Sequence, residues 1–147
     1  MRARQTDSGI TALATLIGAL VPYDGTVELR LPGVHVARRS QTNQEPMHYM
    51  QRSTLCIVAQ GAKIVMIGDD TYGYEAGQMA LYSIDVPMAG RVTRASYSEP
   101  YLLLKIDLDA EKIAELALKV FPHGLPQPRD TRSRWRHERF RGVLRSS

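Results

Sequence analysis

The sequence contains a single cysteine, Cys56, among its 147 residues. A scaffold stabilised by disulfides is therefore excluded, because the chain has no second thiol to pair with it. Long apolar runs are also missing. The longest charge-free stretch near the start, residues 8–23, is shorter than the roughly 18 residues that span a bilayer. We therefore expect a protein with no transmembrane segment and no membrane partner.

Motifs of the common catalytic classes are absent as well. The chain has no G-x-S-x-G, no P-loop and no G-x-G-x-x-G. Its four histidines, His35, His48, His123 and His137, lie more than five residues apart, so no local metal-binding pair such as H-x-H exists. Cys56 lies in an apolar stretch, where a thiol behaves as a small inert hydrophobe. We predict no catalytic residue, no metal site, no cofactor and no enzymatic activity.

An excess of positive charge is confined to the C-terminal end. The formal net charge is +4, but seven arginines lie within residues 129–147, against only Asp130 and Glu138. The rest of the chain is nearly neutral and lacks the electrostatic footprint of a nucleic-acid-binding surface. We expect segment 126–147 to be disordered or non-native in origin. A free-standing DNA or RNA binder acting through these arginines is the less favoured alternative.

The residues that are present predict one folded domain. Hydrophobic residues make up 44% and charged residues 23% of the chain, which excludes wholesale disorder. Residues 10–21 follow two nearby arginines, as in a signal peptide, but no A-x-A-like cleavage site follows them. Their apolar positions keep helical spacing, which favours an amphipathic helix of a cytoplasmic protein. The residues on this stripe are Ile10, Leu13, Ile17 and Leu20.

Between residues 22 and 109, short apolar segments alternate with turn signals, as is typical of an all-β sandwich or barrel. A jelly-roll barrel is the economical closed form, because closure protects strand edges. Pro87 and Gly90 are expected to bracket a loop before a polar edge strand. A helix is expected over 110–121, capped by Asp109 and ended by Pro122. The expected strands are 26–31, 34–39, 54–60, 62–67, 71–75, 79–84, 91–96 and 101–108.

Five residues are candidates for binding a small molecule. The chain has seven tyrosines against two phenylalanines and one tryptophan, and tyrosine suits a pocket for a partly apolar ligand. An ordinary core and a half-exposed sheet face remain the alternative. Arg38 is a solvated strand end or an anion contact, His48 a surface histidine or a ligand contact, and Asp85 an Asx-turn residue or a ligand contact. The candidates are Arg38, His48, Tyr49, Tyr82 and Asp85.

An ordered series of motifs between residues 10 and 125 resembles a known family. The series is V-x-Q-G, G-D, Y-x-Y-x-x-G and S-x-D-x-P, followed by E-P-Y-L and I-D-L-D. It is similar to the N-terminal domain of a subgroup of AraC-type (arabinose-regulator-type) transcriptional regulators. These motifs occupy residues 58–61, 68–69, 72–77, 83–87, 99–102 and 106–109.

The resemblance implies a cupin-like barrel that senses a small effector and forms a homodimer. It places dimer-forming residues in the helix at 110–121, on the face of Ile113, Leu116 and Val120. DNA contact would come through a pair of C-terminal helix-turn-helix units, which this chain is expected to lack. The domain is expected over residues 10–125, after an N-terminal arm at 1–9 and before the segment at 126–147. A metal-dependent cupin enzyme is the alternative, although His48 has no histidine partner for the H-x-H that such enzymes need.

Overall fold

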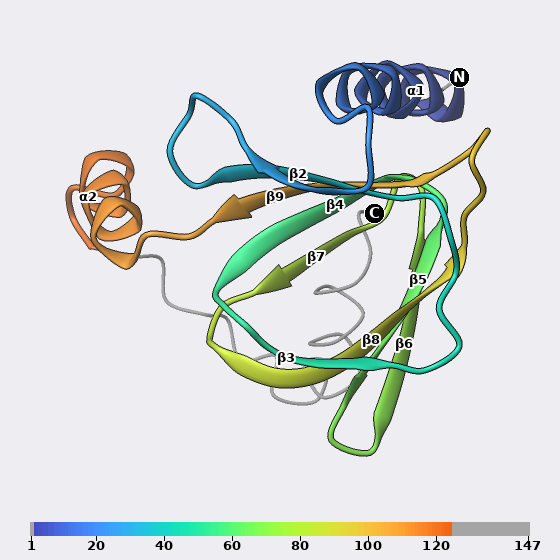
Figure 1. Ribbon diagram of the computed structural model, residues 1–147. Coiled ribbons are helices and arrows are strands. Elements are labelled where there is room, and N and C mark those ends of the chain that lie inside the picture. The colour runs from blue at the N-terminus through green and yellow to red at the C-terminus, as the bar shows by residue number, and fades with distance from the viewer. Residues whose placement is uncertain (1, 125–147) are drawn as a thin grey trace.

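The computed structural model describes residues 2–124, with the side chains of residues 2–7 left aside. Two helices flank nine strands in this part of the chain (Figure 1). No helix among the described residues combines the length and apolar character that a membrane span requires. The elements are α1 Arg2–Leu20, β1 Gly25–Glu28, β2 Val34–Arg39, β3 Met47–Gln51, β4 Thr54–Gln60, β5 Ala62–Ile67, β6 Asp70–Glu75, β7 Met79–Tyr82, β8 Val86–Arg94, β9 Tyr101–Asp107 and α2 Ala110–Val120.

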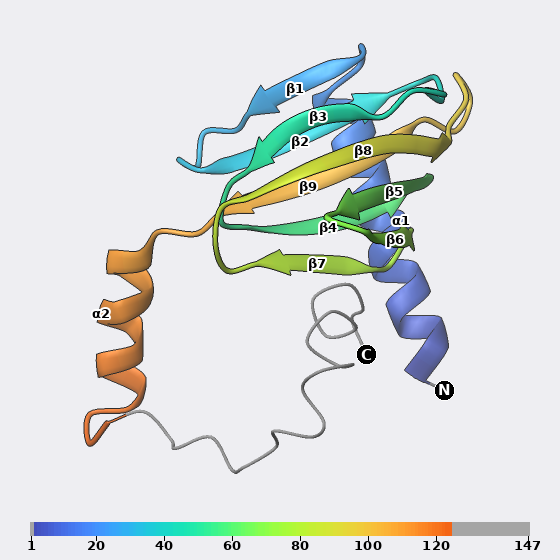
Figure 2. The same cartoon turned by 90° about the horizontal axis from the view of Figure 1, so that it is seen from below.

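The strands form two antiparallel sheets that face each other. One sheet has five strands in the order β1-β2-β9-β4-β7, and the other has four in the order β3-β8-β5-β6. Figures 1 and 2 show α1 lying across the outer face of the five-stranded sheet, whereas α2 extends away beyond the end of β9. The predicted mostly-β barrel with a helix at either end is therefore confirmed.

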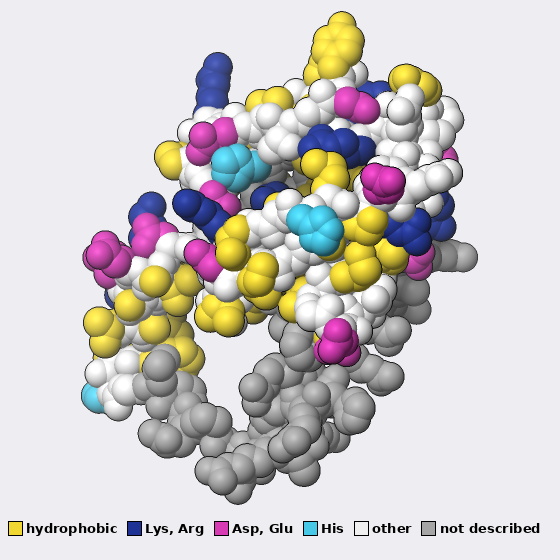
Figure 3. Space-filling model, turned by 60° about the horizontal axis from the view of Figure 1, so that its bottom comes forward, with side chains coloured by type: hydrophobic (Ala, Val, Ile, Leu, Met, Phe, Trp, Pro, Cys, Tyr) yellow, Lys and Arg dark blue, Asp and Glu magenta, His cyan; other side chains and the backbone are white. Residues whose placement is uncertain are grey.

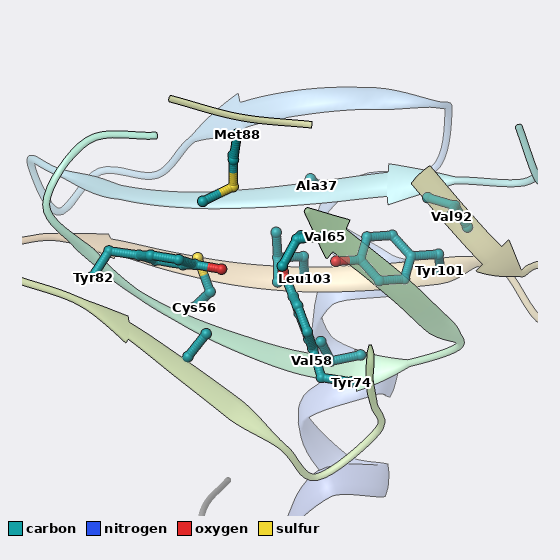
Figure 4. Packing of buried hydrophobic residues seen from close by; sticks show 11 residues of the cluster. Ala37, Cys56, Val58, Val65, Tyr74, Tyr82, Met88, Val92, Tyr101 and Leu103 are labelled. Carbon is teal, nitrogen blue, oxygen red and sulfur yellow. The ribbon is translucent and has the colours of Figure 1, made fainter. Parts of the chain in front are cut away.

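The main core lies between the sheets (Figure 4). Side chains alternate along each strand, so Cys56 and Val58 of β4 point inward, towards Val65 of the opposite sheet. Tyrosines supply much of this core, since Tyr74, Tyr82 and Tyr101 are all buried. The core of buried residues comprises Ala37, Cys56, Val58, Val65, Tyr74, Ala80, Tyr82, Met88, Val92, Tyr101 and Leu103.

A second, smaller core lies beneath α1. Ile17 and Val21 are almost fully buried against Val36, Ala59 and Leu102, which occupy the outer face of the five-stranded sheet. This packing explains why β4 and β9 are apolar on both faces. Leu20 was expected on the buried stripe but is about half exposed. The helix begins at Arg2, so most of the segment expected as an arm at 1–9 is its first part.

Strands β3 and β8 differ from the prediction. No strand was expected at Met47–Gln51, and the expected loop at 87–90 and edge strand at 91–96 are one continuous strand, β8. This strand lies between β3 and β5, so it is not an edge. Pro87 is tolerated because the β5–β8 pairing spans Ala89 to Arg94 and does not reach it. Gly90 does not interrupt β8, and the missing side chain at this position leaves space for the side chains of Lys63 and Tyr49.

Candidate ligand-binding cavity

A cavity of about 490 Å³ lies between the two sheets. Its size falls within the range of roughly 300–1,000 Å³ that small-molecule sites occupy. Strands from both sheets contribute to its wall, so closing the barrel creates it. The lining includes Ala37, Arg39, Met47, Tyr49, Cys56, Lys63, Gly90, Val92, Tyr101, Leu103 and Lys105.

Strand register decides which residues reach this cavity. On β9, Tyr101, Leu103 and Lys105 line it, whereas the intervening Leu102 and Leu104 pack beneath α1. The paired residues on β2 follow the same rule, with Leu103 opposite Ala37 and Tyr101 opposite Arg39. A two-residue period thus divides β9 between a structural face and a cavity face.

Lys63 and Tyr49 meet inside the cavity although β8 separates their strands. The Lys63 Nζ donates a hydrogen bond of 2.9 Å to Tyr49 Oη and lies 5.4 Å from the centroid of that ring. Gly90 makes the meeting possible, because a Cβ there would lie 3.0 Å from Lys63 Cε and 3.1 Å from Tyr49 Oη. Burial raises the pKa of Tyr49 to about 12 and lowers the pKa of Lys63.

Positive charge predominates in the wall of the cavity. Arg39, Lys63, Arg91 and Lys105 line it, against Asp24 as the acidic residue. Asp24 is already engaged, since its Oδ2 accepts hydrogen bonds from the backbone N–H and the hydroxyl of Ser40, at 3.0 and 2.8 Å. These bonds hold the pKa of Asp24 below its usual value. Arg39 is also engaged and donates to the carbonyl oxygens of Gly25 and Arg38.

The two lysines are left without a counter-charge. Among the described side chains, no carboxylate lies within 4.0 Å of the ammonium of Lys63 or Lys105. The ion pairs in this part of the chain join His35 to Asp107, Arg38 to Asp24 and Arg94 to Glu75. The hydroxyl of Tyr101 also lacks a hydrogen-bond partner among the described residues, and this tyrosine is only 3% exposed. Buried polar groups are normally paired, so this hydroxyl is an unused donor on a side chain that lines the cavity.

Of the five residues proposed from sequence, Tyr49 is the one that lines the cavity. Tyr82 does not line the cavity but is buried in the core between the sheets (Figure 4). His48 is exposed and pairs with Ala89 on β8, so it lies on the face of β3 opposite to Tyr49. Arg38 points towards α1, where its Nη1 donates to the carbonyl of Pro22.

Asp85 lies outside the cavity lining and bonds to a distant backbone group instead of forming a local Asx turn. Its Oδ1 accepts a hydrogen bond of 2.9 Å from the backbone N–H of Ser53, so it ties the start of β4 to the start of β8. Sequence reasoning did not identify Lys63, Tyr101 or Lys105 as site residues. A signal for the two lysines was present in the sequence, because each lies among apolar residues of its strand, Lys63 in β5 and Lys105 in β9.

Helix α2 presents an apolar surface of a different kind. Asp109 caps it, because its Oδ1 accepts hydrogen bonds from the backbone N–H groups of Glu111 and Lys112, at 2.9 and 3.2 Å. None of its residues is buried, and the predicted dimer-forming residues are 48–65% exposed. Figure 3 shows apolar side chains gathered over this helix. The predicted dimer-forming residues are Ile113, Leu116 and Val120, and Leu118 is exposed as well.

No metal centre is apparent in the described part of the chain. Within it, no three side chains of His, Cys, Asp or Glu come close enough together to hold an ion. The histidine nearest the cavity in sequence, His48, faces outward, and His35 is bonded to Asp107 at 2.9 Å. The segment at 126–147 lies outside the described residues.

Comparisons with known proteins are consistent with this architecture. A family model described as the N-terminus of AraC-type transcriptional regulators matches residues 30–143, which include β2 through α2 and most of the segment expected as a tail. The chain is also similar to a cupin protein from Bacteroides fragilis, at 16% identity and a TM-score of 0.40. The alignment covers 61% of this chain and 82% of that protein. No curated protein matches the chain.

Proposed function

We propose, from the premise that the chain belongs to the AraC-type transcriptional regulator N-terminus family, that it senses a small-molecule effector for a bacterial regulator and dimerises. The observation that carries the first part is the cavity between the sheets, with a buried tyrosine hydroxyl that has no partner. In this proposal the domain works in the cytoplasm, at residues 10–125. DNA is read elsewhere in the regulator, by helix-turn-helix units.

Effector binding in the cavity has a structural consequence for the fold. The wall combines strands of both sheets, so a bound molecule would contact β2 and β9 on one side and β3, β5 and β8 on the other. A ligand that binds the folded barrel and not the unfolded chain stabilises it by mass action. The proposed sensing step is therefore a change in how firmly the two sheets are held together.

A thermal-shift screen tests this proposal. A panel of small acids, alcohols, sugars, amines and aldehydes is added to the full chain, and we expect at least one class to raise the melting temperature. Ligand at about 100 times its Kd would add roughly 2.7 kcal/mol of stability. Ala37→Met, which fills the cavity from β2, should abolish the shift, whereas His48→Ala on the outer face of β3 should preserve it.

Two outcomes would contradict effector binding in the cavity. One is a panel that leaves the melting temperature unchanged throughout. The other is an Ala37→Met protein that folds and still binds with unchanged affinity. If Ala37→Met fails to fold, Cys56→Met fills the same cavity from the neighbouring strand β4 and replaces it in the experiment.

The second part of the proposal is a homodimer formed through α2. The helix is capped and amphipathic, yet none of its residues is buried in the described chain. An apolar stripe at positions i, i+3 and i+7 is the pattern of a helix that packs against another surface. We propose that a second copy of this chain covers Ile113, Leu116 and Val120, in the role that the family resemblance implies for this helix.

We propose no catalytic role for the chain. Membership of a family of regulatory N-terminal domains supports a binding function. A metal-dependent cupin enzyme would instead bind a transition metal in the barrel, and elemental analysis of the purified full chain distinguishes the two. Iron, manganese, nickel or zinc that copurifies with the chain at a near-stoichiometric level would contradict this part of the proposal.

A further inference from the structure

We propose that the effector carries a carboxylate, which Lys63 and Lys105 hold from opposite sheets while its apolar body fills the rest of the cavity. This inference rests on the proposed function, since it assigns a chemical class to the ligand of the same cavity. Four observations carry it. The two lysines have no carboxylate partner among the described residues, and both line the same cavity. Part of the remaining wall is apolar, and the buried hydroxyl of Tyr101 has no partner among the described residues.

Lys63 has a largely buried ammonium group with no carboxylate partner among the described residues. An ammonium group has three N–H donors, and only one of those on Lys63 is used, by the phenol of Tyr49 at 2.9 Å. The contact with the Tyr49 ring is weaker than an ion pair, because the ring offers only a quadrupole. Burial of an unpaired charge is unfavourable. A carboxylate beside Nζ would supply both the missing charge and an acceptor for the unused donors.

Lys105 approaches the same space from the other sheet. It lies opposite Cys56 in the β4–β9 register, and both residues line the cavity. The positive charges of Lys105 and Lys63 both oppose the effect of burial on the pKa of the Cys56 thiol. Two cations in the wall of one cavity, from opposite sheets, favour an anionic group bound between them.

The rest of the wall defines the body of the ligand. Ala37, Met47, Val92 and Leu103 present apolar surface, and the Tyr49 ring adds an aromatic face. The wall also contains polar side chains, Thr26, Gln41, Thr42, Asn43 and Gln51 among them, which could bond a polar substituent on the ligand. The Tyr101 hydroxyl, buried and unpartnered, can donate one further hydrogen bond to a carboxylate or to a polar substituent.

A carboxylate fits these donors better than a phosphate does. Phosphate sites are usually built from backbone N–H groups at helix N-termini or glycine-rich loops. Here the Lys63, Tyr101 and Lys105 side chains come from paired strands, whose backbone N–H groups serve the sheet ladders. The geometry therefore points to a small carboxylic acid with an aliphatic or aromatic body.

The test uses acids and amides of matched shape. Benzoate is compared with benzamide, and hexanoate with hexanamide, by calorimetric titration of the full chain at neutral pH. We expect at least one acid to bind about tenfold or more tightly than its amide, because charge-assisted hydrogen bonds are roughly twice as strong as neutral ones. Lys63→Met and Lys105→Met should each weaken acid binding about tenfold. Lys112→Met on the exposed helix α2 is the matched control and should bind normally.

The failure of this inference and the failure of the proposed function give different results. Amides that bind as tightly as acids, or acid binding that Lys63→Met and Lys105→Met leave unchanged, would overturn the carboxylate assignment alone. Acids that do not bind while a neutral compound from the broad panel does would overturn it as well. If acids, amides and the whole panel are all silent, the effector cavity itself is refuted. Melting temperatures of both lysine variants establish that they fold.

Discussion

In the binding proposal, Lys63 reduces the stability of the empty barrel and holds the ligand. Its ammonium lies within the barrel and has a phenol as its neighbour, so burial lowers its pKa. A lowered pKa means that the unfolded chain binds the proton more tightly than the folded chain. The protonated lysine therefore opposes folding of the empty barrel, and a bound anion would remove this cost.

This linkage predicts a pH dependence that is specific to Lys63. Between its lowered pKa and the usual value of 10.5, the unfolded state holds more protons, so stability rises with pH in this window. The free energy of unfolding of the wild type should therefore rise relative to that of Lys63→Met between pH 7 and pH 10. Urea titrations of both proteins at several pH values measure this difference. A constant or decreasing difference would contradict the assignment of a buried, uncompensated ammonium.

A second prediction at this scale concerns two glycines with positive φ. Gly61 has a φ of 81°, and a Cβ there would lie 2.6 Å from the carbonyl oxygen of Arg94. Gly68 has a φ of 59° but has no atom within 4 Å of its Cβ position. Gly61→Ala should cost about 2–4 kcal/mol of stability, and Gly68→Ala only the backbone term of about 1–2 kcal/mol. Equal losses in urea unfolding would show that the close approach to β8 is unimportant.

Sequence patterns identified residue types at the site better than they identified positions. The excess of tyrosine was compatible with a ligand pocket or with an ordinary core, and the structure places Tyr74, Tyr82 and Tyr101 in the core and Tyr49, together with Tyr101, in the cavity wall. Lys63 and Lys105 were missed because their orientation depends on strand register, and a shift of one residue would turn both to the outside. Local patterns contain no information on that register, which is fixed by pairing between distant strands.

At the scale of elements, α2 provides the clearest test of dimerisation. Leu116 lies on the apolar stripe with Ile113 and Val120, whereas Leu118 lies two positions away and faces another direction. Leu116→Lys should convert a dimer into a monomer in light-scattering measurements of the full chain, because it places a charge in the interface. Leu118→Lys, which makes the same chemical change at a more exposed position of the same helix, should leave the mass unchanged. A monomeric wild type, or equal effects of both changes, would contradict the proposed interface.

The elements themselves were predictable to different degrees. The N-terminal helix and strands such as β4, β5 and β9 have clear apolar periods, and the structure confirms them. The missed strand β3 is mostly exposed, and its apolar residues Met47, Tyr49 and Met50 do not alternate strictly with polar ones, so its sequence gives no clear strand period. The loop expected at 87–90 was wrong because glycine and proline normally interrupt strands. Here Gly90 instead makes room for Lys63 and Tyr49.

For the whole molecule, the closed arrangement of two sheets is the feature on which function depends. The five-stranded sheet is packed on its outer face by α1 and on its inner face by the shared core. The cavity uses residues that are far apart in sequence, from Asp24 to Lys105, and exists only once the sheets have closed. Composition and spacing predicted the container, whereas the chemistry of its interior required the fold. The boundaries at residues 9, 125 and 126 remain predictions.

A crystal structure of the full chain with its tightest-binding carboxylic acid tests the central claim most directly. We predict electron density for the acid between the two sheets, with its carboxylate within hydrogen-bonding distance of Lys63 and Lys105 and with Tyr101 Oη in contact. A surface hollow of about 720 Å³ lies between α1 and β4, with Arg38 and Gln60 in its lining. Density there, with the interior of the barrel empty, would contradict the account.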